Sequence, residues 1–567
     1  MDGRGPRTGV LERIAPGVAM LHSYERGWFR FDLVAGVVLA AILVPQGMAY
    51  AELAGLPAVT GLYTTITCLI GYAVFGPSRV RVLGPDSSVS PLILAAIVPL
   101  AVADDPAQAI TLAAMLAVIV GLIEIFLGVA KLGFVADLLS KEVQVGYMNG
   151  LAVTIIVGQL PKLCGFSTDA DDFIVELRAF ASGFDQRNSV AVAVGLASLA
   201  VMLLLPHVVP RIPAVLVAVV GATLASALFD LDLPTVGGLP EGLPRLALPW
   251  TDFSDLGPLL IAATGIVLVS LTDTIALSSS LAARRGDEVD PNQEMIGIGA
   301  ANIGAGLFQG FAVSASSSRT PVAEQAGAKS QVTGLVGAGL VALMLVAFPS
   351  VLADLPQTTL AAVVIYAGLS LADITSLRRF WRVRRTSLVL SLVATSGVIF
   401  FGVIEGIIAA IVLSVALFFQ RSWWPHGELL GHFDDGWHAI HTRTTDAEPH
   451  AGVIVFRWEA PLFFANSGMF RQQLRHHIRA NQPRWVVLQC EAITDIDVTA
   501  AEMLERLDIE LNEVGIHVAF VELRTRLHDL LSDYGLLGTL DREHFYGTID
   551  EAFAAIADDT ESEDEPT

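Results

Sequence analysis

The stretch Val82-Leu-Gly-Pro-Asp-Ser-Ser-Val-Ser-Pro91 has a counterpart in the second half of the chain, Phe311-Ala-Val-Ser-Ala-Ser-Ser-Ser-Arg-Thr-Pro321. Both are rich in small and hydroxyl residues and are broken by glycine or proline, which disfavours a continuous helix. Each is the third apolar segment of its half. Interrupted segments at matching places in two halves predict inverted repeats with a ligand site between them. The alternative is that the small residues only allow close helix packing.

The rest of the chain before Trp424 has the apolar character of a membrane protein. Of 567 residues, 53% are hydrophobic and 16% are charged, and the mean hydropathy is +0.61. Apolar runs of about 20 residues recur, enough at about 1.5 Å per residue to cross a hydrocarbon core of about 30 Å. We expect a polytopic α-helical membrane domain over residues 31–424, with about fourteen segments as seven plus seven inverted repeats. The expected centres lie near residues 42, 67, 93, 119, 150, 197, 221, 269, 302, 321, 340, 363, 394 and 413.

Basic residues give the expected orientation of these segments. If residues 1–30 form a cytoplasmic N-terminal segment, most lysines and arginines of the connections fall on the cytoplasmic side, as the positive-inside rule requires. An even number of segments returns the C-terminus to that side, so we expect a multi-pass inner-membrane protein with both termini in the cytoplasm. The cytoplasmic set is Arg79, Arg81, Lys131, Lys141, Arg211, Arg284, Arg285, Arg378, Arg379, Arg382, Arg384 and Arg385; the outer set is Lys162, Arg178, Arg187 and Arg245.

The two interrupted segments offer the chemistry of an anion site. If a helix begins after each break, two helix N-termini meet near the middle of the bilayer, where their free N–H groups and positive dipole ends converge. Such ends bind anions. Acidic residues inside a membrane are costly and usually functional, which singles out Asp86 and, in the eighth segment, Asp273.

After Trp424 the pattern changes to that of a soluble α/β domain. The expected strands are Gly452–Trp458, Trp485–Cys490 and His517–Glu522, and the expected helices are Asn466–Ile478, Thr499–Val514 and two more near Leu527 and Glu551. Residues 425–557 are therefore expected to form a cytoplasmic linker and domain. An acidic tail, residues 558–567, is expected to be disordered.

The sequence gives no support to several other classes of function. It contains no G-x-S-x-G, P-loop or HExxH motif, so we expect no enzyme activity and no cofactor. The three cysteines, Cys68, Cys164 and Cys490, and the histidines of the linker lack the spacing of metal ligands, so no metal site is expected. The formal net charge is -23, and so acidic a soluble part disfavours nucleic acid as a partner.

Pro45-Gln-Gly-Met-Ala-Tyr50, Gly76-Pro-Ser-Arg79 and several further motifs given below form a recognisable set. These motifs resemble those of the sulfate permease family, also called solute carrier family 26. The C-terminal part is similar to the STAS domain of that family, with Asp495-Ile-Asp-Val-Thr499 at its D-x-D-x-T stretch. The resemblance runs from about Trp28 to Ala557. The motifs of the membrane part are Pro45-Gln-Gly-Met-Ala-Tyr50, Gly55-Leu-Pro57, Gly61-Leu-Tyr63, Gly76-Pro-Ser-Arg79, Gly84-Pro85, Asp290-Pro-Asn-Gln-Glu294, Val313-Ser-Ala-Ser-Ser-Ser-Arg319 and Gly327-Ala-Lys-Ser-Gln331.

The resemblance implies a core domain and a gate domain, a homodimer, and transport by an elevator-like displacement of the core. It also implies that the anion lies between the two half-helices and that the first segment completes the pocket. Hydroxyl and N–H donors would replace water around the anion, and Arg319 would add positive potential, unless Arg319 closes a structural ion pair instead. The substrate-binding residues implied at matching positions are Gln46, Tyr50, Asp86, Ser87, Ser317, Ser318 and Arg319.

Asp86 and Asp273 are the candidates for proton coupling. Asp86 places a carboxylate where many relatives have an apolar residue, and a proton taken up with the anion would remove the repulsion between them. Alternatively, Asp86 pairs permanently with Arg319 or caps the half-helix, which leaves coupling to Asp273. Asp273 could itself be a structural hydrogen-bonding centre. Sodium-coupled relatives need a hydroxyl where this chain has Leu277, which makes a sodium site doubtful, although Ser278 could substitute.

The sequence thus predicts a secondary active transporter of a small inorganic anion in a lipid bilayer, with sulfate as the leading substrate and proton symport as the leading coupling. Transport or exchange of bicarbonate, chloride or a dicarboxylate stays open, because N–H dipoles and hydroxyls do not encode the shape of one anion. A non-transporting membrane anchor for a STAS interaction or sensing module is the alternative class. Val498 stands where stand-alone STAS proteins have a phosphorylated serine, so we expect no such switch, and we expect Thr499 to cap its helix.

Overall fold

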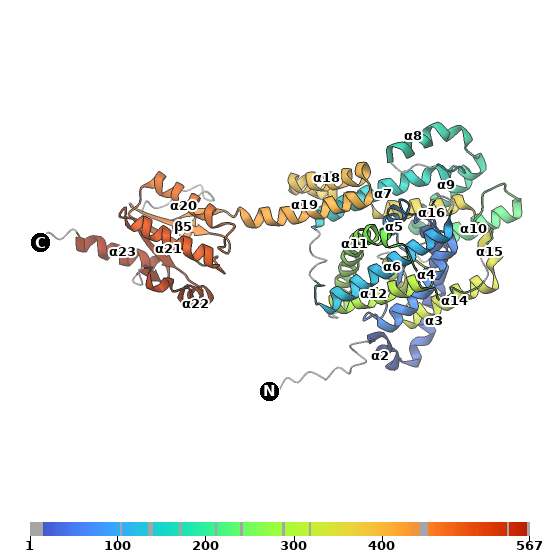
Figure 1. Ribbon diagram of the computed structural model, residues 1–567, viewed down its shortest axis with the longest axis horizontal. Helices are drawn as coiled ribbons and strands as arrows, with labels where there is room; N and C mark the ends of the chain where they lie inside the picture. The colour runs from blue at the N-terminus through green and yellow to red at the C-terminus, as the bar shows by residue number, and fades with distance from the viewer. Residues whose placement is uncertain are drawn as a thin grey trace. The chain divides into compact units, whose positions relative to one another are not determined.

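The computed structural model describes residues 15–102, 105–133, 140–168, 173–209, 212–238, 242–285, 290–316, 319–434, 436–440, 452–540 and 544–563. The chain divides into two compact units, residues 1–414 and 415–567. The first is a helical bundle and the second is an α/β domain, and Figure 1 labels their elements. The boundary between the units lies within the last helix of the bundle, a short way before the Trp424 boundary expected from the sequence.

Fourteen helices of the described chain correspond to the fourteen expected segments, and each expected centre lies inside one of them. Within the described ranges, seven helical segments are long and apolar enough to cross a membrane, and four shorter apolar helices accompany them. The third helix of each half is short, as the interrupted segments predicted. The first half is α3 (Phe29–Leu53), α4 (Ala58–Phe75), α5 (Ser90–Ile97), α6 (Pro106–Val129), α7 (Lys141–Leu163), α9 (Ser189–Val208) and α10 (Ala214–Phe229). The second is α11 (Phe253–Arg285), α12 (Pro291–Leu307), α13 (Arg319–Gln325), α14 (Val332–Ala347), α16 (Gln357–Leu371), α18 (Arg385–Phe401) and α19 (Val403–Trp423).

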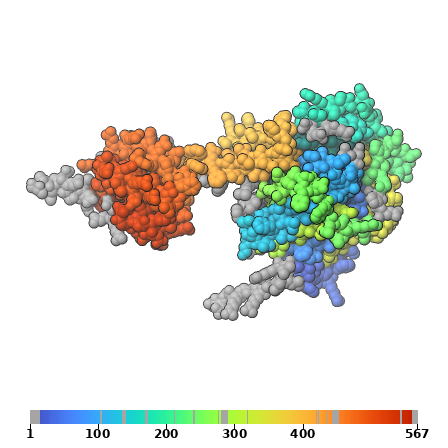
Figure 2. Space-filling view, viewed as in Figure 1, coloured from blue at the N-terminus to red at the C-terminus, as the bar shows by residue number. Residues whose placement is uncertain are grey.

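The two halves interlock rather than stand side by side. Helices α3, α4 and α6 of the first half pack on α11, α12 and α14 of the second and form a core bundle, while α7, α9 and α10 pack with α16 and α18 in a gate bundle. The colours of the first and second halves are correspondingly interleaved on the face shown in Figure 2. Glycines allow α6 and α12 to approach closely: a Cβ on Gly121 would lie 2.4 Å from the carbonyl oxygen of Gly299.

A buried aspartate ties the first helix of the bundle to α14. The Asp32 side chain is fully buried, and its Oδ1 accepts hydrogen bonds from the backbone N–H groups of Lys329 (2.7 Å) and Ser330 (3.1 Å) and from the Thr333 hydroxyl (2.9 Å). Its Oδ2 accepts from the hydroxyls of Ser330 (2.7 Å) and Tyr24 (3.1 Å). The donors other than Tyr24 lie at the N-terminal end of α14, where a carboxylate is stabilised by the unpaired N–H groups and by the helix dipole.

The C-terminal unit is built on a six-stranded sheet with the order β4-β3-β5-β6-β7-β8. Strands β5 to β8 are parallel, and β3 is antiparallel to both β4 and β5. The strands are β3 (Gly427–Phe433), β4 (Gly436–Ala439), β5 (Val453–Trp458), β6 (Trp485–Gln489), β7 (His517–Val521) and β8 (Phe545–Tyr546), and the helices are α20 (Ser467–Asn481), α21 (Val498–Asn512), α22 (Thr525–Asp533) and α23 (Ile549–Glu563).

Alternate residues of the central strands face opposite sides of this sheet, and both sides are covered. Ile454, Phe456 and Trp458 belong to a buried cluster with apolar residues of α20, α21 and α22. Their neighbour Val455 lies in a second cluster with α23. Successive residues of a strand point to opposite faces, and here both faces are covered by apolar residues. The sequences of the central strands are therefore nearly continuous apolar runs.

Three local expectations for the C-terminal unit were wrong or incomplete. The segment expected to be a linker contains the β3–β4 hairpin. Asp497, not Thr499, caps α21, because its carboxylate accepts the Ala500 N–H at 2.8 Å. Helix α23 continues to Glu563, so part of the tail that was expected to be disordered is helical, and residues 564–567 lie outside the described residues.

Candidate functional site

The two interrupted segments meet in the core bundle and pair with each other. Strand β1 (Leu83–Gly84) and strand β2 (Ser314–Ala315) are antiparallel, with Leu83 opposite Ala315 and Gly84 opposite Ser314. Helix α5 begins a few residues after β1, and α13 begins a few residues after β2. This pairing satisfies backbone groups that the breaks leave without helical partners, which is a requirement at membrane depth.

Arg319, the first residue of α13, reaches back to the first break. Its side chain is buried, with 1% exposed, and donates hydrogen bonds to the carbonyl oxygens of Pro85 and Gly84, the latter at 3.3 Å. It also forms an ion pair with Asp86 Oδ2 at 3.3 Å. Asp86 Oδ1 in turn accepts from the backbone N–H (3.1 Å) and hydroxyl (2.9 Å) of Ser88. The alternative in which Asp86 pairs with Arg319 and caps the turn before the half-helix is thus the geometry that the structure shows.

Side chains from neighbouring helices hold the second break in place. The Thr64 hydroxyl of α4 accepts the Phe311 N–H at 3.0 Å. Asn302 of α12 forms hydrogen bonds with both backbone groups of Val313. Its Oδ1 accepts the Val313 N–H at 2.7 Å, and its Nδ2 donates to the Val313 carbonyl at 3.4 Å. Thr64 and Asn302 were not predicted as site residues from the sequence, because a polar residue in a helix does not by itself indicate which group it will bind.

The Asn302 side chain is held by the carboxylate of Glu124, which was also not predicted from the sequence. Glu124 of α6 is fully buried, and its Oε2 accepts the other hydrogen bond of Asn302 Nδ2 at 2.8 Å. Its Oε1 accepts the Ser270 hydroxyl of α11 at 3.1 Å. Glu124 therefore links α6, α11 and α12 to the backbone of the second break. A single carboxylate within the apolar run of α6 was the signal in the sequence.

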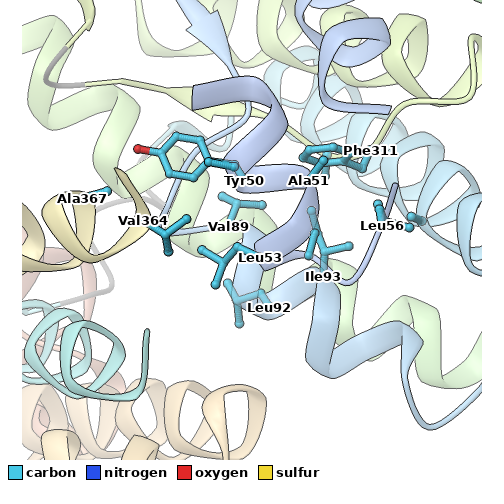
Figure 3. Close-up of a cluster of buried hydrophobic side chains, with 14 of the residues drawn as sticks. Tyr50, Ala51, Leu53, Leu56, Val89, Leu92, Ile93, Phe311, Val364 and Ala367 are labelled. Carbon is cyan, nitrogen blue, oxygen red and sulfur yellow. The ribbon is translucent and has the colours of Figure 1, made fainter. Parts of the chain in front are cut away.

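Residues of α3 and α5 bring the site to the boundary between the core and gate bundles. Tyr50 is buried and lies close to Ser87, Arg319 and, on α16, Tyr366. In Figure 3 the Tyr50 ring lies in the same cluster as Val364 of α16, together with Val89 before α5 and Phe311 of the second break. Gln46 lies one helical turn before Tyr50 and is buried, and among the described residues its side-chain oxygen has no hydrogen-bond partner.

Asp273 of α11 lies near the same place. Its Oδ1 is 3.5 Å from Gln144 Nε2 of α7, a gate helix, and it is close enough to Asp86 to interact with it electrostatically. The structure thus brings together Gln46, Tyr50, Asp86, Ser87, Arg319 and Asp273, whereas Ser317 and Ser318 lie outside the described residues.

Ser278, the residue that could have replaced the missing sodium-site hydroxyl, is engaged elsewhere. Its hydroxyl donates to the Thr274 carbonyl at 2.7 Å and accepts from Arg81 Nη2. Arg81 also forms a buried ion pair with Glu294 of α12 at 2.8 Å, and the Tyr72 hydroxyl donates to Glu294 at 2.7 Å. This cluster joins α4, α11 and α12.

The architecture defines a class of membrane protein: two interlocked halves of seven helices, each with a broken third helix, and the breaks paired inside a core bundle. The chain belongs to the sulfate permease family. The model of that family matches residues 29–394, and the model of the STAS domain matches residues 444–552.

Individual relatives agree with this assignment. A probable sulfate transporter of Mycobacterium tuberculosis is 38% identical over 551 residues, which cover 96% of this chain and 98% of that protein. Chloroplastic sulfate transporter 4.1 of Arabidopsis thaliana is 28% identical, over 96% and 82% of the two chains. Murine SLC26A9 in its inward-facing state has the same fold, with a TM-score of 0.87 over 98% of this chain and 96% of that one at 23% identity. The transmembrane domain of the cyanobacterial bicarbonate transporter BicA superposes with a TM-score of 0.60 over 70% of this chain and 97% of that one, at 24% identity.

Proposed function

We propose that this protein is a secondary active transporter, not an enzyme, and that it carries sulfate across the inner membrane. The observation that carries the proposal is the pair of broken helices with the Arg319 guanidinium buried between them. Buried N–H and guanidinium donors replace the hydration shell of an anion, and their attraction is strong in a medium of low dielectric constant. Sulfate is favoured over other anions because the relatives in bacteria and plants are named as sulfate transporters.

The site lies where a moving core could carry its ligand past a stationary gate. Tyr50 and the two breaks belong to the core bundle, while Tyr366 and Gln144 belong to gate helices. We propose an elevator-like displacement of the core bundle in a homodimer, with both termini in the cytoplasm. The hydrogen bonds that tie the second break to α4 and α12 support movement of the core as one body.

Asp273 is the better candidate for proton coupling. The Asp86 carboxylate already accepts hydrogen bonds from Arg319 and Ser88. Asp273 has no cation at ion-pair distance among the described residues, and its neighbour Gln144 lies on the gate. A movement of core against gate would change that contact, which a coupling residue needs.

Uptake by purified protein in liposomes tests the proposal. Radiolabelled sulfate is expected to accumulate with an inward proton gradient and to equilibrate without accumulation when the gradient is collapsed. Unlabelled sulfate is expected to compete better than bicarbonate, chloride or a dicarboxylate. Uptake of bicarbonate but not sulfate would give the other anion as substrate, and no uptake of any of these anions by correctly inserted protein would favour the non-transporting anchor.

Glu124→Ala is expected to raise the dissociation constant for sulfate at least about tenfold, because Asn302 loses the acceptor that orients it toward Val313. Glu124→Gln, which keeps an oxygen acceptor for Asn302, is the matched control and is expected to change the dissociation constant less. Calorimetry on the purified protein measures both. Equal dissociation constants for the Ala and Gln variants would show that this hydrogen bond does not support the site.

Ending the chain after Trp424 is expected to leave sulfate binding intact while lowering expression, dimer stability or turnover. The reason is that the proposed site lies wholly in the first unit. Binding and the oligomeric state are measured on the truncated protein after its insertion has been checked. A truncated protein that is inserted and stable but does not bind sulfate would contradict the site assignment.

A further inference from the structure

The short helix α17 (Ile374–Val383) is amphipathic, and it has no part in the proposed anion site. Its sequence is Ile374-Thr-Ser-Leu-Arg-Arg-Phe-Trp-Arg-Val383, and two more arginines, Arg384 and Arg385, follow directly. Apolar residues recur at Ile374, Leu377 and Trp381, a spacing that places them on one side of a helix. The arginines of the helix occupy the other side.

The position of α17 in the chain places it at the end of the bundle. It connects the C-terminal end of α16 to the first residue of α18, and it packs against α18 and α7. Its first turn is fixed: Asp373 caps it through the Ser376 N–H at 2.9 Å, and the Asp373 N–H donates to Asn149 of α7 at 3.0 Å. Because two long apolar helices flank it, α17 lies at the level where the bilayer surface is expected.

Side chains on both faces of this helix are partly or fully exposed. No residue of α17 is buried; Trp381 is 64% exposed and Ile374 is 55% exposed. Arg378, Arg379, Arg382, Arg384 and Arg385 are all exposed, and in the part of the chain that the structure describes none of these guanidinium groups forms an ion pair. An exposed tryptophan is costly in water, and a tryptophan beside exposed arginines matches a membrane interface, where indole rings and cationic side chains both concentrate.

We propose that α17 is a binding surface for anionic phospholipid headgroups. The apolar side, with Ile374 and Trp381, enters the boundary between headgroups and acyl chains, and the arginines bind the phosphate groups of the same leaflet. The planar guanidinium group donates two parallel hydrogen bonds to a phosphate, which gives arginine an advantage over lysine in this role. The positive-inside pattern puts this helix on the cytoplasmic leaflet, whose anionic lipids attract such clusters.

The helix also connects the lipid surface to the gate bundle. It connects α16 to α18 in the chain and is tied to α7 through Asn149, and all three helices belong to the gate. Lipid bound at α17 would therefore hold the gate against the bilayer. This inference does not depend on which anion is transported.

Hydrogen–deuterium exchange of the full-length protein in lipid nanodiscs tests the proposal. Exchange of residues 374–385 is expected to be slower in phosphatidylcholine discs containing phosphatidylglycerol than in discs of phosphatidylcholine alone, and the difference is expected to shrink at high salt. The triple variant Arg378→Gln, Arg379→Gln, Arg382→Gln is expected to lose the difference. Binding of soluble short-chain phosphatidylglycerol to the detergent-purified triple variant is expected to be about a hundredfold weaker, at about fivefold per arginine.

A matched control neutralises three exposed arginines of the C-terminal unit, Arg479→Gln, Arg484→Gln and Arg524→Gln, and is expected to behave as the parent protein. Equal exchange of residues 374–385 in the two kinds of disc would overturn the proposal. So would slow exchange in phosphatidylcholine alone that is lost on removal of residues 558–567, because the acidic end of the chain would then be the occupant. A comparable loss of phosphatidylglycerol binding in the control would show that net charge, not α17, binds the lipid.

Discussion

Arg319→Gln is expected to abolish sulfate binding and to destabilise the core bundle. The change removes the group that joins the two breaks and leaves the mostly buried Asp86 carboxylate without its cation. Breaking one side of a buried ion pair costs about 3 to 5 kcal/mol, which is a large part of the stability of most domains. Thermal unfolding and sulfate calorimetry on the purified variant measure the two effects.

A second substitution separates the structural role of Arg319 from its role in binding. Arg319→Gln combined with Asp86→Asn removes both charges and is expected to recover most of the thermal stability, because no unpaired carboxylate remains. Sulfate binding is expected to stay absent. Recovery of binding in the double variant would contradict the site assignment, since Arg319 would then serve only the ion pair.

Asp273→Asn is expected to abolish accumulation of sulfate against its gradient while sulfate-for-sulfate exchange continues. An asparagine resembles the protonated acid but cannot release a proton, so the core can still move with its anion yet gains nothing from the proton gradient. Lower external pH is expected to strengthen uptake by the parent protein, because a proton bound with the anion favours anion binding by linkage. The same change of pH is expected to leave exchange by Asp273→Asn unaltered.

Asp86→Asn is the control for this experiment. It leaves Arg319 without its carboxylate partner, so it is expected to impair binding at every pH rather than to change the coupling. Accumulation of sulfate by Asp273→Asn under an inward proton gradient would contradict the coupling role. Normal exchange but no accumulation by Asp86→Asn would return that role to Asp86.

The helical fold was predictable because a membrane imposes strong rules on sequence. Apolar runs of a fixed minimum length reveal the spanning helices, and glycine, proline and serine at the matching segments reveal the two breaks. The central strands of the C-terminal unit were predictable for a related reason, since buried parallel strands read as short apolar runs. The β3–β4 hairpin was missed because polar and histidine residues hide its alternation, although the sequence pair Asp435-Gly436 is a hairpin signal.

The side chains that hold the second break in place were harder to predict from the sequence than the residues of the candidate site. Thr64, Glu124 and Asn302 hold the second break, yet each is a single polar residue in an otherwise apolar helix. Periodicity shows which segments are helical, but it does not show which helices touch. Which helices touch is seen only in the structure, where α12 crosses α4 and α6 and small residues bring their backbones close together.

The pairing of β1 with β2 has a consequence for access from the two sides of the membrane. Antiparallel pairing of equivalent elements requires a local two-fold axis that passes between the strands, and for inverted repeats this axis lies in the plane of the bilayer. Rotation about such an axis exchanges the inner and outer leaflets. In the proposed site, an anion near the axis would meet similar backbone whether it arrives from one side or the other, so entry and exit would need no separate binding surfaces. The charged pair, Arg319 from one half and Asp86 from the other, breaks that equivalence.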